Sequence, residues 1–320
     1  MTSTDLKPLS THARLDTLIA RAQASAADAP PAIAMVYACD ALALDAAARV
    51  AAAGLARPIL VGPADAIARA ADAANVDVKS FEVVATADAP AAAAARATEL
   101  ARDGHAAALM KGSLHTDELM SAVVRKDTGL RGDARISHAF VFDLPRYPKL
   151  LALADCVVNI APNLQTKRDI IGNAVRLLQH LGIAHPKVAI VTAVEMVNPA
   201  IAATLDAQAL VALAALGEWP GAIVEGPFGF DNAISAEAAR VKKMESKVAG
   251  DVDLMLMPDL NAGNMLYKSF NYIGGGDCAG LVLGARVPIV LTSRADSLQS
   301  RIASVALAVL ASASQSNPRN

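Results

Sequence analysis

Short apolar runs recur along the chain between longer alanine-rich segments of helical character. A strand that is covered by helices on both faces is apolar throughout instead of alternating, and these runs have that form. The pattern therefore predicts an α/β fold with mainly parallel sheets. The strands are expected at Ile33–Tyr37, Pro58–Val61, Ala107–Met110, Ala139–Asp143, Cys156–Ile160, Lys187–Val194, Ala222–Glu225, Asp253–Met257, Gly280–Leu283 and Pro288–Thr292.

The segments between these runs predict helices. Pro90 suits the first turn of one helix, where its missing N–H costs nothing. Ser235 is a candidate N-cap of another, and Glu237 would lie in the first turn of that helix. The expected helices include Ala41–Ala53, Ala91–Arg102, Thr116–Val124, Lys167–Leu181 and Ala236–Lys243.

A length of 320 residues is sufficient for two domains, although no linker rich in proline, glycine or serine interrupts the chain. Pro145–Pro148 is the best candidate for a crossing between lobes. A second crossing near Gly284–Val287 would return the last strand and helix to the first lobe. We therefore expect a first α/β domain at 1–147 and 286–320, and a second at 148–285.

Composition narrows the class of protein. Hydrophobic residues make up 54% of the chain, but no apolar run approaches the ~18 residues of a membrane helix, and the N-terminus does not resemble a secretory signal. Three widely spaced cysteines suit reduced thiols. A net charge of −2 and 3% aromatic residues disfavour a nucleic-acid-binding protein. We expect a soluble cytoplasmic protein that binds small molecules, with no nucleic-acid or membrane partner.

Polar clusters follow several of the expected strands, where an open α/β sheet binds ligands. Lys111 and Ser113 follow the strand that ends at Met110, and they suit an anion. Arg125, Arg131 and Arg135 come next and could bind phosphate in bidentate fashion. The alternative readings are a helix cap for Ser113 and a solvated surface for the arginines.

Three later clusters have similar compositions. Asp231 and Asn232 could cap a helix or face a cleft, and the sequence does not decide between these roles. In PDLNAGN, a loop places Asp259, Asn261 and Asn264 ahead of a helix. A turn requires some of these residue types, but not all of them together.

The last cluster is LTSRADS. Arg294 directly follows a buried strand, an expensive position unless the guanidinium meets an anion, and Ser293 adds a hydroxyl donor beside it. Asp296 could pair with Arg294 structurally or accept a proton from a substrate.

The stretches EGPFGFDNAIS, SKVAGDVDLMLMPDLNAGNMLYK and GLVLGARVPIVLTSRADS, in this order and spacing, resemble the phosphate acetyltransferase and phosphate butyryltransferase family. MKGSLHTDEL resembles the phosphotransacylase half of bifunctional enoyl-CoA hydratase/phosphate acetyltransferase chains. The resemblance implies the reversible reaction of acyl-CoA with phosphate to give acyl phosphate and coenzyme A. It also implies two α/β lobes around a cleft, related to isocitrate and isopropylmalate dehydrogenases, and a homodimer without a metal or a tightly bound cofactor.

The resemblance also suggests roles for individual residues. Arg294 would bind the phosphoryl group, and Ser293 would donate a hydrogen bond to the developing charge on the acyl carbonyl. The family's proposed base, an Asp seven residues after that serine, corresponds here to Ser300. Asp296 is the substitute candidate; alternatively, Arg294 and helix N-termini lower the thiol pKa without a dedicated base. Among the arginines expected to bind coenzyme A, Arg125 is the first choice and Arg135 the second.

Rival interpretations remain open at this point. A covalent acyl-enzyme on Cys156 or Cys278 is disfavoured because neither has a nearby histidine in the sequence. The glycine run Gly274–Gly280 raises the alternative of an NAD-dependent dehydrogenase, but it lacks the frame of a dinucleotide-binding motif. A non-catalytic module that binds coenzyme A or acyl phosphate is a third reading, and the sequence does not separate acetyl from butyryl preference.

Overall fold

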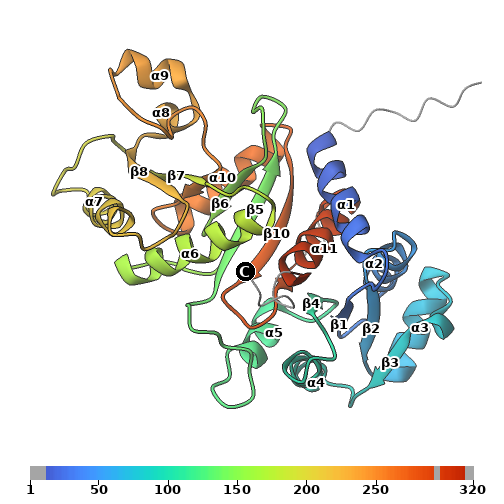
Figure 1. Cartoon of the computed structure of the whole chain (residues 1–320). Coiled ribbons are helices and arrows are strands. Elements are labelled where there is room, and N and C mark those ends of the chain that lie inside the picture. The colour runs from blue at the N-terminus through green and yellow to red at the C-terminus, as the bar shows by residue number, and fades with distance from the viewer. Residues whose placement is uncertain (1–11, 292–295, 314–320) are drawn as a thin grey trace, which may run out of the picture.

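The computed structural model of the chain describes residues 12–291 and 296–313 (Figure 1). Within them, eleven strands form a single sheet. Across the sheet, the order is β3 (Glu82–Ala85), β2 (Arg57–Gly62), β1 (Ala32–Val36), β4 (Ala108–Lys111), β11 (Ile289–Val290), β10 (Asp277–Leu283), β5 (Ser137–Asp143), β6 (Leu151–Ala154), β9 (Leu254–Leu256), β7 (Lys187–Val191) and β8 (Ile223–Phe228).

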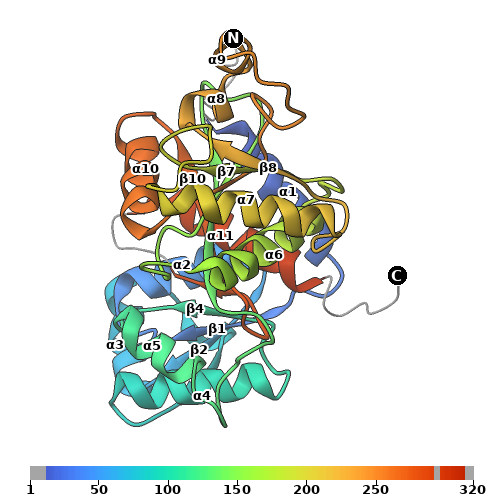
Figure 2. The ribbon, with the colours of Figure 1, turned by 90° about the vertical axis from the view of Figure 1, so that its left-hand side faces the viewer.

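The sheet consists of two parallel blocks joined by two antiparallel strands. Strands β3, β2, β1, β4 and β11 form the first block, and β6, β9, β7 and β8 form the second. Between them, β10 is antiparallel to both β11 and β5, and β5 is antiparallel to β6. The two blocks therefore run in opposite directions, and Figure 2 shows them as the lower and upper halves of the molecule.

Helices cover both faces of this sheet. They are α1 (Ala13–Ala26), α2 (Ala41–Ala52), α3 (Ala64–Ala74), α4 (Pro90–Arg102), α5 (Thr116–Val123), α6 (Leu164–His180), α7 (Ala202–Ala215), α8 (Phe230–Ile234), α9 (Ala236–Val241), α10 (Leu260–Tyr272) and α11 (Leu298–Ala313), with a short 3₁₀ helix at Val78–Ser80. Among the described residues, no helix has the length and apolar character needed to cross a membrane.

The apolar core is continuous on one face of the sheet and divided on the other. On the first face, α1, α2, α6 and α11 share one cluster with side chains from both blocks. On the second face, α4 and α5 cover the first block, whereas α8 and α10 belong to a separate cluster over the second block. Strand β10 contributes Val282 to the former and Cys278 to the latter. The division therefore falls along β10, near Gly280.

Most of the expected elements are present, including the predicted helix starts. Pro90 is the first residue of α4, and the Ser235 hydroxyl accepts a hydrogen bond from the Ala238 N–H at 3.2 Å. The α/β class with a mostly parallel sheet is confirmed. Strand β3 and helices α1, α3 and α7 were not expected from the sequence.

One predicted strand is wrong. Cys156–Ile160 is a loop, and the strand lies earlier, at Leu151–Ala154. The Asp155 carboxylate accepts hydrogen bonds from the N–H groups of Val157 at 2.8 Å and Val158 at 2.9 Å. These amides are therefore engaged by a side chain instead of a neighbouring strand, a competition that is typical of aspartate.

Both segments proposed as crossings between lobes are turns between neighbouring strands of the sheet. Pro145–Pro148 lies in the turn between β5 and β6, and Gly284–Val287 lies in the turn between β10 and β11. After β11, α11 packs against α1 on the continuous face (Figure 1). The division into two domains with these boundaries stays a prediction.

Candidate active site

The first part of the candidate site lies where β4 and β11 end side by side. Val290 pairs with Met110, so Lys111 comes next to the chain that leads into residues 292–295. The Lys111 ammonium donates to the Leu114 carbonyl at 3.2 Å, which turns the loop after β4 around the cation. Ser293 and Arg294, the two central residues predicted from the sequence, lie outside the described residues.

Ser113 fixes the same loop to the neighbouring strand. Its hydroxyl donates to the Tyr37 carbonyl at 2.8 Å, just beyond the end of β1. Gly112 makes this close approach possible, because a Cβ there would lie 2.6 Å from the carbonyl oxygens of Val36 and Tyr37. The hydroxyl proton of Ser113 is thus used within the protein, while its lone pairs stay free to accept.

The start of α11 is bound to the amino end of β10. The Ser297 hydroxyl donates to the Asp277 carboxylate at 2.6 Å and accepts from the Ser300 N–H at 2.9 Å, so it caps the helix. Arg301 donates from Nε to the Asp296 carbonyl at 3.3 Å. These contacts hold Asp296, the first described residue after positions 292–295, in a half-buried position.

Ser300 has a structural role. It is buried, and its hydroxyl donates to the Cys278 carbonyl of β10. A neutral hydroxyl is too weak a base to take the proton of a thiol, and the proton of this one is already bonded to the backbone. The position where the family resemblance places an Asp therefore carries no base in this chain.

PDLNAGN was expected to be a loop ahead of a helix, but helix α10 already begins at Leu260, so Asn261 and Asn264 lie within its first turns. Asp259 caps the helix by accepting from the Ala262 N–H at 3.0 Å, and Asn264 donates to the Cys156 carbonyl at 3.3 Å. Asn261 is exposed. Further along, the Tyr267 ring stacks on Phe140 with 4.1 Å between centroids. Burial raises the pKa of Tyr267, and the charges of Cys278 and Asp296 act in the same direction.

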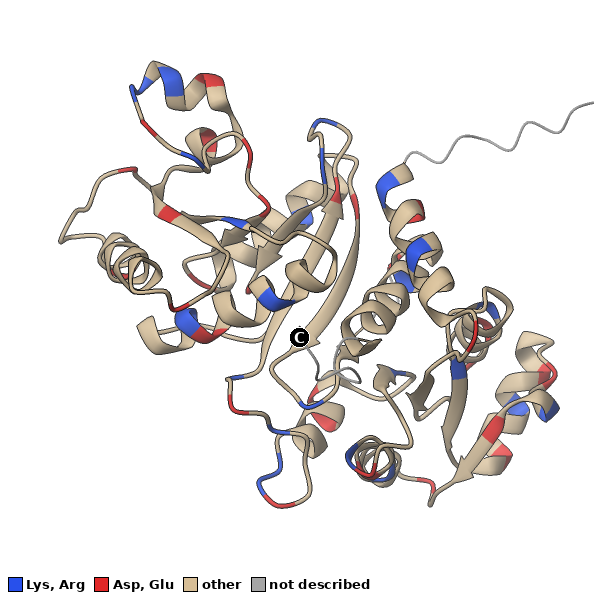
Figure 3. Cartoon of the chain, in the orientation of Figure 1, with Lys and Arg blue, Asp and Glu red and all other residues tan. Residues whose placement is uncertain are grey.

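A hollow of about 480 Å³ lies at the opposite end of β10 and is called the Arg135 hollow here. Its polar lining consists of Arg131, Asp133, Arg135, Asn159 and Asp169. Basic residues gather in the segment that follows α5 (Figure 3), which makes the hollow suitable for phosphate groups. Arg125 lines a separate hollow of about 390 Å³ between α4 and α5, beside Arg96 and Arg102.

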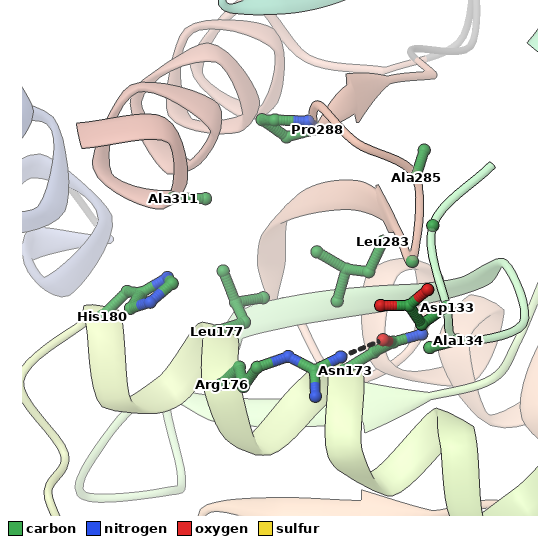
Figure 4. A pocket seen from close by; sticks show the side chains of 12 residues that line it. Asp133, Ala134, Asn173, Arg176, Leu177, His180, Leu283, Ala285, Pro288 and Ala311 are labelled. Carbon is green, nitrogen blue, oxygen red and sulfur yellow. Dashed lines mark hydrogen bonds between the residues drawn. The ribbon is translucent and has the colours of Figure 1, made fainter. Parts of the chain in front are cut away.

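A further cavity of about 290 Å³ lies behind the Arg135 hollow, between α6 and the turn that joins β10 to β11 (Figure 4). Its polar lining includes Asn173, Arg176 and His180. The Arg176 guanidinium donates to the Asn173 amide oxygen at 2.6 Å. Burial lowers the pKa of His180, and the positive charge of Arg176 lowers it further.

Asp231 and Asn232, for which the sequence left two roles open, take part in a polar cluster. Lys242 forms ion pairs with Asp231 and with Glu195, each at 3.1 Å. The hydrogen bond from Lys242 lowers the pKa of Asp231. Asn232 is buried and donates to Glu195 at 3.4 Å. Both residues thus connect the loops after β7 and β8.

The chain matches the sequence profile described as phosphate acetyl/butaryl transferase over residues 90–309. It is 48% identical over 299 residues to a phosphate acetyltransferase of Rhizobium meliloti, an alignment that covers 93% of each chain. The chain belongs to the phosphate acetyl/butyryl transferase family. A phosphate butyryltransferase of Clostridium acetobutylicum is 40% identical over 257 residues, which are 80% of this chain and 85% of that one.

Solved structures agree with this family assignment. A branched-chain phosphotransacylase from Enterococcus faecalis V583 superimposes with a TM-score of 0.78 at 28% identity, over 88% of this chain and 99% of that chain. A putative 4-hydroxythreonine-4-phosphate dehydrogenase from Salmonella typhimurium reaches a TM-score of 0.55 at 15% identity, over 88% of this chain and 99% of that chain. The second likeness shows a shared fold alone.

The glycine run that suggested a dehydrogenase does not lie where a dinucleotide-binding loop would lie. Gly274–Gly276 follows helix α10 and precedes β10, whereas a dinucleotide-binding glycine loop follows a strand and opens a helix. Among the described residues, no group of three or more His, Cys, Asp or Glu side chains is placed to hold a metal ion.

Sequence reasoning missed the buried polar residues beneath the site. His138 is 1% exposed, and its Nδ1 has no hydrogen-bond partner among the residues that the structure describes. The Asp155 carboxylate is 3% exposed and also accepts from the Asn159 amide at 2.7 Å. The Asp-Asn spacing in DCVVN was the available signal, but the apolar residues between them favoured a strand.

The cysteines are poorly placed for covalent catalysis. Cys156 and Cys278 are both buried in the core under α10. Burial raises the pKa of each thiol, and the nearby Asp155 adds to the effect at Cys156. Because the thiolate is the reactive form, both side chains are expected to be inert.

We expect the double variant Cys156→Ala, Cys278→Ala to keep turnover within about threefold of the original enzyme, because neither thiol has to react. Initial rates of acetyl-CoA formation from acetyl phosphate and coenzyme A would check this. Thermal unfolding would be measured in parallel, since each buried Cys→Ala change removes core volume. Loss of all activity in a folded double variant would support an acyl-enzyme instead.

Because His138 is buried, we expect the folded protein to lose stability as the pH falls. Burial lowers the pKa of His138 from 6.5 to about 4, although the Asp155 charge acts in the opposite direction. Below pH 6.5, the unfolded chain binds a proton that the folded protein excludes until about pH 4, so the free energy of unfolding decreases across this window, by up to about 3 kcal/mol.

Urea unfolding of the original protein and of His138→Gln, measured at steps between pH 7 and pH 4, would check this expectation. The His138→Gln variant should show a shallower decrease of stability with falling pH. Equal pH dependence in both proteins would mean that His138 is not the group responsible.

Proposed function

We propose that this protein catalyses the reversible transfer of an acyl group between coenzyme A and inorganic phosphate, by direct reaction of the two substrates in a ternary complex. Membership of the phosphate acetyl/butyryl transferase family, matched over residues 90–309, is the observation that carries the proposal. The buried, high-pKa cysteines support direct transfer over an acyl-enzyme.

The reaction joins a phosphate oxygen to the acyl carbonyl carbon and releases coenzyme A. A phosphate oxygen attacks the thioester carbonyl, the C–S bond breaks, and the coenzyme A thiolate leaves and takes up a proton. In our proposal, Arg294 and Lys111 bind the phosphoryl group, and Ser293 donates a hydrogen bond to the oxyanion. The position of Lys111 beside the end of β11 supports its share in this role.

Asp296 is our candidate for the base that removes the thiol proton in the direction of acyl-CoA synthesis. A free thiol with a pKa of ~8.5 is only a few per cent thiolate at neutral pH, so a positioned base raises the reactive fraction. Two observations support Asp296: it is held at the start of α11 by the contacts around Ser297, and the alternative position, Ser300, is buried and bonded to the backbone.

We assign the phosphates of coenzyme A to Arg135, together with Arg131, in the Arg135 hollow. The seven residues of β10 separate this hollow from Asp296 by about 20 Å. The extended pantetheine arm of coenzyme A suits such a span. Asn264, Asn261 and Asp259 at the start of α10 would bind along this path, with Ser113 on the opposite side. Arg125, the first choice from the sequence, lines the separate hollow between α4 and α5 and is a further candidate for these phosphates.

The acyl group in our proposal is acetyl or butyryl, the two named among the relatives. Thiol release from acetyl-CoA, butyryl-CoA and longer acyl-CoAs, with and without phosphate, distinguishes them. It also separates an enzyme from a module that only binds coenzyme A, because such a module would release no thiol with any of these substrates.

Arg294→Ala should lower phosphate-dependent turnover by at least about a hundredfold, the size typical of removing one group that stabilises transition-state charge. Thiol release with acetyl-CoA and arsenate or phosphate would measure it. Arg240→Ala is the matched control, because Arg240 is exposed and, within the described part of the chain, forms its ion pair with Glu237 of the same helix, α9. Near-normal activity in Arg294→Ala would remove the main site assignment.

We also propose that the protein is a cytoplasmic homodimer. Several large apolar side chains of the second block are exposed, among them Met196, Leu216, Tyr272 and Ile273 at 72%, 84%, 78% and 85%. Exposed apolar side chains of this size are candidates for burial in an interface with a second copy of the chain. The three free cysteines suit a reducing compartment.

Light scattering should give twice the chain mass of 32.9 kDa for the original protein. The double variant Tyr272→Glu, Ile273→Glu should dissociate into folded monomers if the end of α10 lies in the interface, because it places two charges there. A monomeric original protein would contradict the dimer.

A further inference from the structure

The backbone of Arg135 is held on both sides by side chains of helix α6. Its N–H donates to the Asp169 carboxylate at 3.1 Å, and its carbonyl accepts from the Asn173 amide at 2.9 Å. The Arg135 side chain itself is exposed and lines the Arg135 hollow. The residue therefore has a fixed backbone and a guanidinium that can reach a ligand.

The residues that follow Arg135 are held in the same manner from the loop after β6. The Asn159 amide donates to the Ile136 carbonyl at 3.0 Å, and the Asp155 carboxylate accepts from the His138 N–H at 3.1 Å. Four side chains, two from α6 and two from the loop after β6, therefore hydrogen-bond to the backbone at the start of β5. Regular strand pairing of β5 takes over from Ser137 onward.

Asn173 is not among the residues that line the hollow. It is 3% exposed, and it faces the cavity on the other side of the chain, beside Arg176 (Figure 4). Its amide nitrogen also donates to the Ser137 hydroxyl at 2.9 Å. A ligand in the Arg135 hollow would therefore not touch Asn173 directly.

Arg176 determines which way the Asn173 amide points. The guanidinium donates to the amide oxygen at 2.6 Å, and a guanidinium has donors but no acceptor. The oxygen must therefore face Arg176, and the NH₂ group must face the Arg135 carbonyl. Gly284 makes room for this arrangement, because a Cβ there would lie 2.5 Å from that carbonyl oxygen and 2.9 Å from the Asn173 nitrogen.

We propose that Asn173 is a positioning residue for coenzyme A binding: oriented by Arg176, it holds the backbone of Arg135 so that the guanidinium meets the coenzyme A phosphates. This inference rests on the role proposed above for Arg135. Bidentate contacts to phosphate depend on the direction of the guanidinium plane, so a small displacement of the backbone weakens them. Asn173 acts through Arg135 and not on the reacting atoms.

The test is Asn173→Asp, which keeps the size of the side chain. One carboxylate oxygen still accepts from Arg176, which keeps the group ionised, but the other oxygen now faces the Arg135 carbonyl and repels it. We expect the KM for coenzyme A to rise about tenfold, which corresponds to about 1.4 kcal/mol. The KM for acetyl phosphate and kcat should change less than twofold, since the phosphoryl end of the site is unaffected.

Combination with Arg135→Ala shows whether the effect passes through the guanidinium. Arg135→Ala alone should raise the KM for coenzyme A, and adding Asn173→Asp should then change it little further. An equal rise in both backgrounds would overturn the positioning role while leaving the role of Arg135 intact. An unchanged KM in Arg135→Ala would refute that role and this inference with it, but the acyltransferase activity itself would still stand.

Two further variants keep the proposal testable. One serves if Asn173→Asp fails to fold, and the other controls for a general effect of changing α6. Arg176→Met leaves Asn173 in place but removes the donor that orients its amide, so the KM for coenzyme A should rise about threefold in a folded protein. Gln179→Ala is the matched control, because its amide donates from the same helix to the Pro220 carbonyl at 2.9 Å, away from Arg135. If Gln179→Ala raises the KM for coenzyme A as much as Arg176→Met does, Asn173 has no specific role.

Discussion

The antiparallel pairing of β10 with β5 is the constraint on which the rest of this structure depends. It extends over seven residue pairs, from Asp277 opposite Asp143 to Leu283 opposite Ser137. Because β10 also pairs with β11 and β5 also pairs with β6, these two strands connect two parallel blocks that run in opposite directions. The pairing brings the last segment of the chain back to the middle of the sheet.

The same strand organises the candidate site from both of its ends. At the amino end, Asp277 and Cys278 hold the first turn of α11 through Ser297 and Ser300. Beyond the carboxyl end, Ala285 pairs with Arg131, next to the Arg135 hollow. On the divided face, Gly280 has no side chain where Phe140 lies closest, 2.9 Å from an added Cβ. An elongated substrate with charges at one end and a reactive thioester at the other matches this layout.

Much of the fold could be predicted because buried strands and amphipathic helices leave local patterns. The apolar runs located β1, β2, β5 and β10 within a few residues, and Pro90 and Ser235 marked helix starts. The loop at Cys156–Ile160 could not be predicted, since its apolar composition is that of a strand. Only the buried position of Asp155 reveals that its carboxylate binds the amides of this loop.

The sequence by itself determined the α/β class, the family and the polar clusters that follow the strands, because these depend on residue types close together in the chain. Tertiary structure decided which groups work together. Asn173 meets the Arg135 carbonyl across 38 residues, and Ser300 meets the Cys278 carbonyl across 22. Hydrogen bonds of this kind depend on distances and directions set by packed helices and paired strands, and composition and spacing carry no record of them.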